Sequence, residues 1–378
     1  MKSLSVLRGK IKVHPEDFQV EEVVEIPIKD KGEYSYYKLK KKNINTLLVL
    51  DLIQKYWKVS RDRIGFCGLK DKRAVTTQYI SIKNGPEENL HGPNFTLTFL
   101  GKGENPLKLG DAKGNIFTVT LRNVNSSKIF KNLNLVREIG FVNYFGEQRF
   151  APDLYTKEPL VKYFLKKDYE TAFKEYFTQH PKKSKLLKKL WGNWEKFLKH
   201  AGHLSAVEKR VLLNFIKKGD PEKALKVFPK HLKLLFLFSY QSLLWNRVAC
   251  ELVKRCSSNF FCVNFVKREK LCFYKELSPD LKLLKGLKIP YISKEVLTWH
   301  GPSFVKEIIL KIIKDENLEN KLDSEVLGLK IFTPGERTFI VFPKGLKVVN
   351  YAKKVFTIRF FLPSGSYATI FLLKLLSI

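Results

Sequence analysis

The hydrophobic periodicity of this chain changes near residue 155 and returns to its first form near the C-terminus. Up to about residue 150, short runs of β-type composition are separated by Gly, Asn, Asp and Pro, and they read FQVEEVV, YSYYKLKK, QYISI, FTLTFLG and IFTVTLRNV. Two stretches with helical spacing interrupt them, at residues 46–58 and 125–140, the second with Asn or Ser capping its start. The pattern predicts an α+β region.

The middle of the chain has a different character. After about residue 155, Lys- and Leu-rich helical patterns such as SKLLKKLWGNWEKFLKHAG and AVEKRVLLNFIKKG continue to about Arg255. Between residues 259 and 342, short strands alternate with a helix near residues 302–315. The last stretch resembles the first region, with the alternating run VFTIRFFLP, a PSGS turn and a helix from about Tyr367. We therefore expect the two ends to form one domain around a second one.

The charge of the chain indicates a polyanionic partner. Lys and Arg number 69 against 37 Asp and Glu, a formal net charge of +32. Nucleic acid is the commonest partner of such a protein, because every phosphate that a cation neutralises releases a condensed counterion. The alternative is a lysine-rich solvated surface. The chain has 29 Phe and 15 Tyr, so rings that could stack on bases are present, although most Phe are expected in the core.

The cysteines and the apolar runs indicate a reducing, cytoplasmic setting. The five cysteines, at 67, 250, 256, 262 and 272, are odd in number and include no Cys-x-x-Cys pair, which argues against a disulfide framework and a zinc site. The N-terminus lacks the features of a signal peptide, and no apolar run reaches the roughly 18 residues of a spanning helix. We expect a soluble internal protein.

Common cofactor and metal motifs are missing from the sequence. No G-x-x-x-x-G-K-[ST] loop occurs, and the string GKGENP at 101–106 ends in Pro where a dinucleotide fingerprint needs Gly. His200 and His203 have no nearby carboxylate pair or cysteine and are interpreted as surface residues. No G-x-S-x-G elbow is present. Any chemistry is therefore expected from carboxylates and bases, with no cofactor and no metal.

One segment places a carboxylate where it could act as a nucleophile. In GFCGLKDKRAVTTQYISI, residues 65–82, Asp71 lies in a short turn between an apolar run and a β-type run, flanked by Lys70, Lys72 and Arg73. Cations this close stabilise the ionised form of a carboxylate, which is the nucleophilic form. An isolated KDKR would ordinarily be a charged surface turn.

Five segments, in order, resemble signatures of the TruD family of tRNA pseudouridine synthases. GLKDKRAVTTQ resembles the catalytic signature, and the others are HPEDFQVEE at 14–22, LGDAKGNIFTVTLRNV at 109–124, NYFGEQRF at 143–150 and RFFLPSGSYAT at 359–369. The resemblance covers roughly residues 10–150 and 340–372 and is weaker in between. Two positions depart from the usual pattern: Ala151, where the family usually has Gly, and Tyr367, where Phe is common.

The resemblance assigns residues to an active site. Asp71 falls on the catalytic aspartate, and Phe145 on the aromatic residue beside the target base. The resemblance places Phe18, Asn143 and Tyr367 on substrate-contacting positions. These residue types suit that role, because a pyrimidine flipped out of folded RNA is held by stacking and by hydrogen bonds to its edge. For an isolated Phe, core packing is the better interpretation, and for an isolated Asn, a turn. Possible supporting residues are Lys12, Lys70, Gln78 and Arg149.

The resemblance also implies a fold and a reaction. The expected fold class is α+β, with a catalytic domain of residues 1–154 and 341–378 around a mixed, largely antiparallel sheet. A TruD-specific α+β domain of residues 155–340 is inserted, and tRNA would lie in the cleft between the two. The expected reaction is the isomerisation of one tRNA uridine to pseudouridine. The expected target is uridine 13, the alternative is another tRNA position or another RNA, and the protein is expected to be a monomer.

Two questions of mechanism and two other functions stay open from the sequence. Asp71 attacks the ribose anomeric carbon or adds to the uracil ring, and no residue is assigned to the late proton abstraction. A non-catalytic RNA-binding protein would need the charge but not Asp71. A methyltransferase or nuclease would need a methyl-donor pocket or clustered carboxylates for metal, and the sequence indicates neither.

Overall fold

The structure is a computed structural model that describes Leu7, residues 10–266 and residues 269–378. The described residues form two compact units, one of residues 142–340 and one of the chain up to residue 141 together with residues 341–378. The chain passes from one unit to the other within two short strands, β8 (Phe141–Val142) and β15 (Ile340–Val341). The expected domain boundaries, between residues 154 and 155 and between residues 340 and 341, stay a prediction.

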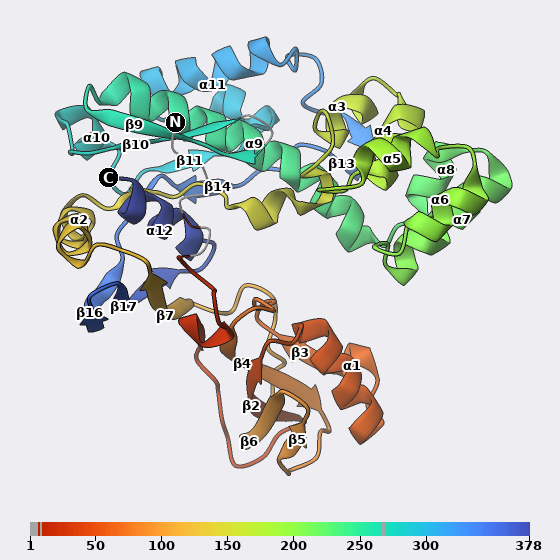
Figure 1. Ribbon diagram of the computed structural model, residues 1–378, viewed down its shortest axis with the longest axis horizontal. Coiled ribbons are helices and arrows are strands. Elements are labelled where there is room, and N and C mark those ends of the chain that lie inside the picture. The colour runs from red at the N-terminus through yellow and green to blue at the C-terminus, as the bar shows by residue number, and fades with distance from the viewer. Residues whose placement is uncertain (1–6, 8–9, 267–268) are drawn as a thin grey trace. The chain divides into compact units, whose positions relative to one another are not determined.

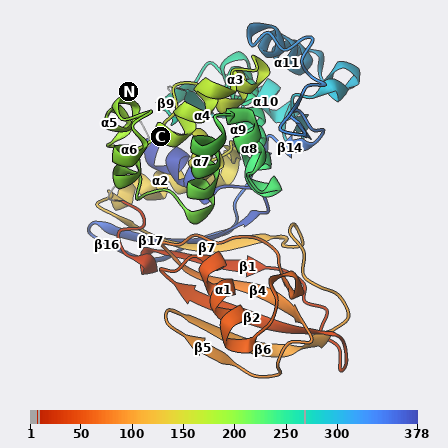
Figure 2. The same ribbon diagram turned by 90° about the vertical axis from the view of Figure 1, so that its right-hand side faces the viewer.

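The unit that contains both chain ends is built on a nine-stranded sheet (Figure 2). The strand order is β16-β17-β7-β1-β4-β2-β6-β5, with β3 beside β4. Strands β1 and β4 run parallel, and the other pairings of this sheet are antiparallel. The strands are β1 (Phe18–Val23), β2 (Tyr34–Lys42), β3 (Ile64–Phe66), β4 (Val75–Lys83), β5 (Leu90–Gly92), β6 (Phe95–Gly103), β7 (Gly114–Arg122), β16 (Lys344–Ala352) and β17 (Val355–Pro363). The expected mixed, largely antiparallel sheet is confirmed.

Three helices belong to this unit: α1 (Thr46–Trp57), α2 (Ser126–Ile139) and α12 (Ala368–Ser377), with the 3-10 turns η2 (Pro15–Asp17) and η3 (Arg61–Arg63). The side chain of Asn45 caps α1 by accepting from the Leu47 N–H, and that of Asn125 caps α2 by accepting from the Lys128 N–H. The sequence predicts both helices because their apolar spacing and their caps are local signals.

The apolar face of α1 covers one end of the sheet. Val49, Leu50 and Ile53 of the helix are fully buried with Leu39 of β2 and Ile80 of β4 in one hydrophobic cluster. Because side chains alternate along a strand, the residues of β2 that share the parity of Leu39 point to this covered face. Packing thus fixes which side of β2 is inward.

The other unit is organised around the long helix α9 (Lys230–Cys256) (Figure 1). Helix α11 (Ser303–Asp315) and the hairpin of β9 (Phe260–Asn264) and β10 (Lys270–Tyr274) pack against α9. The remaining elements are η4 (Glu147–Asp153), α3 (Leu160–Leu165), α4 (Tyr169–Thr178), α5 (Ser184–Lys189), α6 (Trp194–His200), α7 (Ala206–Lys218), α8 (Pro221–Lys226), α10 (Pro279–Leu283), β11 (Lys288–Pro290), η6 (Lys294–Thr298), β12 (Glu325–Val326), β13 (Leu329–Lys330) and β14 (Glu336–Thr338).

The cysteine prediction is wrong in one respect. A disulfide joins Cys262 and Cys272, which lie directly opposite each other on β9 and β10 with their Cα atoms 4.0 Å apart. Cysteine number and Cys-x-x-Cys spacing carry no information on strand pairing, so the sequence argument missed this pair. The other three cysteines, Cys67, Cys250 and Cys256, are buried and free.

Two further properties concern only the residues that the structure describes. In these ranges no helix is both long and apolar enough to cross a membrane. No group of three or more His, Cys, Asp or Glu side chains within them is arranged to hold a metal ion.

Candidate active site

Asp71 lies in the loop between β3 and β4, and two polar side chains beneath the loop hold its backbone. The Lys70 N–H donates to Oγ1 of Thr46, the first residue of α1, at 3.2 Å. Nε2 of Gln78, in β4, donates to the Gly68 carbonyl at 3.2 Å. Thr46 and Gln78 are themselves hydrogen-bonded at 3.1 Å and fully buried. The loop that carries Asp71 is therefore fixed from two elements of the sheet unit.

A third support comes from Lys41 in β2. Its Nζ donates to the carbonyl of Asp71 itself at 2.8 Å and to that of Ile44 at 2.9 Å. The side chain is almost completely buried, with 1% of its surface exposed. Burial lowers the pKa of Lys41 to about 8, against an opposing effect of Asp71 and with a small contribution of Lys70 in the same direction.

The carboxylate of Asp71 is paired with an ammonium from a distant part of the sequence. Nζ of Lys12 lies 2.9 Å from Oδ2 of Asp71, and the side chains are 21% and 23% exposed. The same Nζ lies 4.1 Å from the ring centroid of Phe18, so the cation sits over the ring. Lys12 has a φ of 53°, a left-handed conformation that costs a residue with a Cβ free energy. The fold thus brings Asp71, Lys12 and Phe18 together.

Lys70 is committed to a different carboxylate. Its Nζ pairs with Glu22 of β1, and the two side chains are 9% and 0% exposed. The other oxygen of Glu22 accepts from the Tyr79 N–H at 3.0 Å. Lys70 and Gln78, both expected near the active site, therefore stabilise the loop that carries Asp71. Lys70 does so through its buried ion pair with Glu22, and Gln78 through its hydrogen bond to the Gly68 carbonyl.

The other two candidates in the sheet unit lie at element ends. Phe18 is the first residue of β1, is 1% exposed and meets Phe117 edge to face at 5.9 Å. Tyr367 is half-buried at the N-terminus of α12, where its carbonyl accepts from the N–H groups of Ile370 and Phe371.

Asn143, Phe145 and Arg149 lie in the other unit, in a cluster built around Arg337. The guanidinium of Arg337 donates to Oδ1 of Asn143 at 3.0 Å and to the Tyr144 carbonyl at 3.3 Å. Its central carbon lies 4.0 Å from the ring centroid of Phe145. Arg337 is 7% exposed and Asn143 5% exposed, so these bonds are shielded from water.

Phe145 is enclosed by further partners. Its N–H donates to Oδ1 of Asn246 at 2.8 Å, and Nδ2 of Asn246 donates back to its carbonyl at 3.1 Å. Trp245 meets the ring edge to face at 5.8 Å, and the guanidinium of Arg149 lies 5.5 Å from it while donating to Ser242 Oγ at 3.0 Å. Only 5% of the Phe145 surface is exposed.

The sequence interpretation missed Lys41, Glu22, Arg337 and Asn246. The sequence does contain a signal for Lys41. It follows the buried residues Tyr37 and Leu39 at every second position of β2, which indicates an inward side chain, whereas three consecutive lysines are more typical of a solvated face. Arg337 and Asn246 lie in the part of the chain where the family resemblance is weak, and no local pattern marks them.

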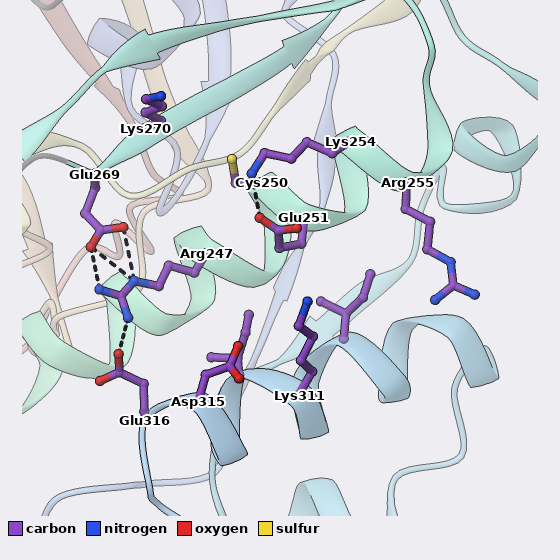
Figure 3. Close-up of a pocket in the computed structure, with 12 residues that line it drawn as sticks. Arg247, Cys250, Glu251, Lys254, Arg255, Glu269, Lys270, Lys311, Asp315 and Glu316 are labelled. Carbon is purple, nitrogen blue, oxygen red and sulfur yellow. Dashed lines mark hydrogen bonds and ion pairs between the residues drawn. The ribbon is translucent and has the colours of Figure 1, made fainter.

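A cavity of about 700 Å³ in the second unit lies beside α9 and α11 (Figure 3). Its lining carries both signs of charge, and Arg247 is engaged by Glu269 and Glu316. Lys254 on its rim is paired with Glu251. Three of the cations that line this cavity, Arg247, Lys254 and Arg255, are thus paired with carboxylates.

Comparisons with known proteins agree with the five segments. The family described as tRNA pseudouridine synthase D (TruD) matches residues 1–282. The tRNA pseudouridine synthase D of Aquifex aeolicus is 38% identical over 97% of both chains. "Probable tRNA pseudouridine synthase D 2" of Methanocaldococcus jannaschii is 35% identical over 96% of this chain and 90% of its own. A crystal structure named for TruD of Methanosarcina mazei has the same fold, with a TM-score of 0.70 at 22% identity over 98% of this chain and 94% of that one.

Proposed function

The chain belongs to the TruD family of tRNA pseudouridine synthases, and from this premise we propose that it converts uridine 13 of tRNA to pseudouridine with Asp71 as the nucleophile. It is an isomerase. The glycosidic bond between N1 of uracil and the ribose is broken, the uracil rotates, and a bond between C5 and the ribose forms. C5 loses a proton and N1 gains one, so product and substrate have the same atoms and electrons. The reaction needs no redox partner and no phosphoryl donor.

The pairing of Asp71 with Lys12 is the observation that supports this proposal. The ammonium 2.9 Å from the carboxylate gives Asp71 a counter-ion and a charge-assisted hydrogen bond. With about a quarter of its side chain exposed, Asp71 is still open to a ligand. An ionised carboxylate can attack the ribose anomeric carbon or add to the uracil ring, and both routes begin from this arrangement.

The fixed loop contributes orientation. Thr46, Gln78 and Lys41 hold the backbone on both sides of the nucleophile, so little freedom is lost when the target uridine arrives. We propose that Phe18 and Tyr367 contact the flipped nucleotide from the same unit. Phe145 and Asn143 are proposed substrate contacts as well, and Asn143 would use its amide nitrogen because Oδ1 already accepts from Arg337.

The excess of cations supports binding of tRNA through its phosphates. With a net charge of +32, the affinity should fall steeply as salt rises. We propose that the protein acts as a monomer in the cytoplasm.

The test is carbodiimide mapping of pseudouridine on tRNA transcripts incubated without any cofactor. The wild-type protein should modify uridine 13, and a transcript with cytidine at that position should stay unmodified. Asp71→Asn should bind tRNA and make no pseudouridine. Asp51→Asn, at an exposed position of α1, is the matched control and should act like the wild type.

The results distinguish a pseudouridine synthase from a non-catalytic RNA-binding protein. Modification that disappears only in Asp71→Asn supports the enzyme and its nucleophile. Modification at another uridine would change the target and keep the reaction. Tight binding without modification by any of the proteins would favour a non-catalytic RNA-binding protein.

A further inference from the structure

We propose that Lys41 is a positioning residue for the reaction, whose buried ammonium fixes the backbone of Asp71 and keeps a positive charge beneath the nucleophile. The inference rests on the proposed function, because it concerns the same carboxylate. It adds a group that lies outside all five segments of the family resemblance and that the lysine-rich sequence around it hides.

The geometry around Lys41 uses the full donor capacity of its ammonium. An ammonium has three N–H bonds. Nζ of Lys41 lies within hydrogen-bond distance of three carbonyls: Ile44 at 2.9 Å, Asp71 at 2.8 Å and Lys70 at 3.4 Å. Two of these carbonyls belong to consecutive residues of the loop that carries the nucleophile. A rotation of that loop would break both bonds, so Lys41 sets the direction in which the Asp71 side chain leaves the backbone.

Two charged side chains of the loop act on Lys41. Asp71 attracts the ammonium, and Lys70 repels it but is itself paired with Glu22. Lys12 meets Asp71 at its carboxylate, while Lys41 meets the same residue at its backbone carbonyl. The neighbouring side chains of α1 and β4, Thr46 and Gln78, are neutral. Lys41 is thus held by carbonyl groups of the loop and of Ile44.

The burial of Lys41 carries a cost, because an ammonium among carbonyls is desolvated, which is why the pKa of Lys41 falls to about 8. Lys41→Met removes the ammonium and leaves the carbonyls of Ile44 and Asp71 without their buried donor, so it should lower stability. If Lys41 serves the fold alone, the folded variant should keep the wild-type rate. If it positions the nucleophile, the rate of the folded variant should fall as well.

The first experiment compares Lys41→Met with Lys42→Met. Lys42 is the next residue on β2 and points to the opposite side, where its side chain is 55% exposed and pairs with Glu16. In single turnovers at saturating tRNA, the rate of Lys41→Met should fall by about 100-fold, the scale of a misplaced catalytic group. Its Kd for tRNA should stay within about twofold, and both rates are measured well below the thermal midpoint of the variant, which the two unpaired carbonyls should lower. Lys42→Met should keep the wild-type rate.

The second experiment uses pH, because the ammonium is lost as pH rises through about 8. The wild-type single-turnover rate should decrease above about pH 8, and this decrease should be absent from Lys41→Met. Lys41→Arg keeps its charge at every pH of the experiment, so it should recover part of the rate and show no alkaline decrease. A group with a structural role alone would give Lys41→Arg and the wild type the same profile.

The stability of the two proteins should depend on pH in a defined direction. The pKa of Lys41 is about 8 in the folded chain and about 10.5 in the unfolded one, so the unfolded chain binds more protons between these values. The cost of the buried ammonium is fully present below pH 8 and disappears as pH rises toward 10.5. The thermal midpoint of the wild type should therefore rise relative to that of Lys41→Met as pH increases above 8.

The outcomes keep the inference separate from the proposed function. A wild-type protein that makes no pseudouridine would overturn both. A wild-type protein that is active while Lys41→Met matches its rate would overturn the inference alone. If Lys41→Met does not fold, the pH profiles of the single-turnover rate of the wild type and Lys41→Arg decide. A decrease at alkaline pH that persists in Lys41→Arg contradicts the inference, and a decrease seen only in the wild type supports it.

Discussion

The loop around Asp71 and the cluster around Phe145 each contain a segment that resembles the family, yet they are held by different means. At Asp71, a partly exposed carboxylate meets an ammonium, and buried polar side chains bind the backbone beneath it. At Phe145, a nearly buried ring lies against a guanidinium, and Asn246 binds both polar groups of its backbone. The first region leaves the carboxylate of Asp71 partly exposed, whereas the second encloses Asn143 and Phe145.

This difference shows why a motif match alone does not assign a role. Asp71 is 23% exposed and pairs with the ammonium of Lys12, so its carboxylate is partly accessible. Phe145 is 5% exposed and its ring is fixed by contacts within its own unit, which leaves little of it for the proposed contact with a nucleotide. The two regions should therefore respond differently to substitution: the first mainly in activity and with a dependence on charge, the second mainly in stability.

The largest expected effect is that of Arg337→Ala. The change removes the donor for Asn143 and Tyr144 and the cation over Phe145, so unsatisfied carbonyls remain in a buried site. We expect the free energy of unfolding to fall by about 3 to 5 kcal/mol, measured by urea denaturation. Arg337→Lys should recover only part of this, because one ammonium cannot reproduce the planar fork.

The control for this prediction is Arg149→Ala. Arg149 also lies near the Phe145 ring but makes its hydrogen bond to the hydroxyl of Ser242. Its loss should cost about 1 kcal/mol. Equal costs for the two variants would mean that ring packing, and not the buried hydrogen bonds of Arg337, holds the cluster.

The next largest effect should come from the disulfide of the same unit. The hydroxyl of Tyr144 donates to the Cys272 carbonyl at 2.7 Å, so the bridge between β9 and β10 also supports the motif beside Phe145. For a closed loop of this length, we expect Cys262→Ser to lower the free energy of unfolding by about 2 to 3 kcal/mol. A reductant should lower the thermal midpoint of the wild type and leave that of Cys262→Ser unchanged.

Mass spectrometry after alkylation checks the premise of that prediction. The native protein should keep two cysteines protected by the bridge, and unfolding without a reductant should expose only Cys67, Cys250 and Cys256. Five alkylated cysteines under the same conditions would show that the bridge does not form, and the reductant would then have no effect.

For the Asp71 region, Lys12→Met should change activity far more than stability. The pair of Lys12 and Asp71 is partly exposed, so its loss should cost less than about 1 kcal/mol of unfolding free energy. We expect the single-turnover rate to fall by about 10- to 100-fold, because the proposed nucleophile loses its counter-ion. Lys29→Met is the control, because Lys29 pairs with Glu104 at a well exposed site of the same unit. Similar rates for both variants would remove Lys12 from the reaction.

The predictions from sequence succeeded where the determining signals are local. The strands 18–23, 34–42, 75–83, 95–103, 114–122 and 355–363 follow from alternation of apolar residues between turn residues. The starts of α1 and α2 follow from Asn45 and Asn125, whose side chains cap the next turn. The SKLLKKLWGNWEKFLKHAG stretch breaks into α5 and α6, because Gly192 between them adopts a φ of 94°.

The rest depends on contacts that no local pattern encodes. The disulfide follows from the register of β9 against β10, and the enclosure of Phe145 follows from Arg337, almost two hundred residues away in the chain. Lys41 lies between these cases. Its parity on β2 indicates an inward side chain, but only the packed structure shows that carbonyl groups are there to receive an ammonium.

The smallest expected effect is one of pH, and it tests whether the two regions differ in charge dependence. Asp17 ends the turn that leads from Lys12 to Phe18. Burial raises the pKa of its carboxyl, but hydrogen bonds from Arg122 and the His14 N–H outweigh burial, so the pKa lies below its ordinary value of 3.8. The stability that Asp17 contributes is therefore fully present above pH 3.8 and lost as pH falls below it.

Asp17→Asn should lower the free energy of unfolding by about 1 kcal/mol at pH 6, because a charge-assisted pair becomes a neutral one. The thermal midpoints of the variant and the wild type should converge as pH falls below 3.8, where the carboxyl becomes protonated. The cost of Arg337→Ala should depend less on pH over this range, because its hydrogen bonds to Asn143 and Tyr144 end on carbonyl and amide oxygens that do not titrate. A cost of Arg337→Ala that also declines in acid would mean that a carboxylate stabilises the Phe145 cluster, and the contrast between the two regions would then be one of exposure alone.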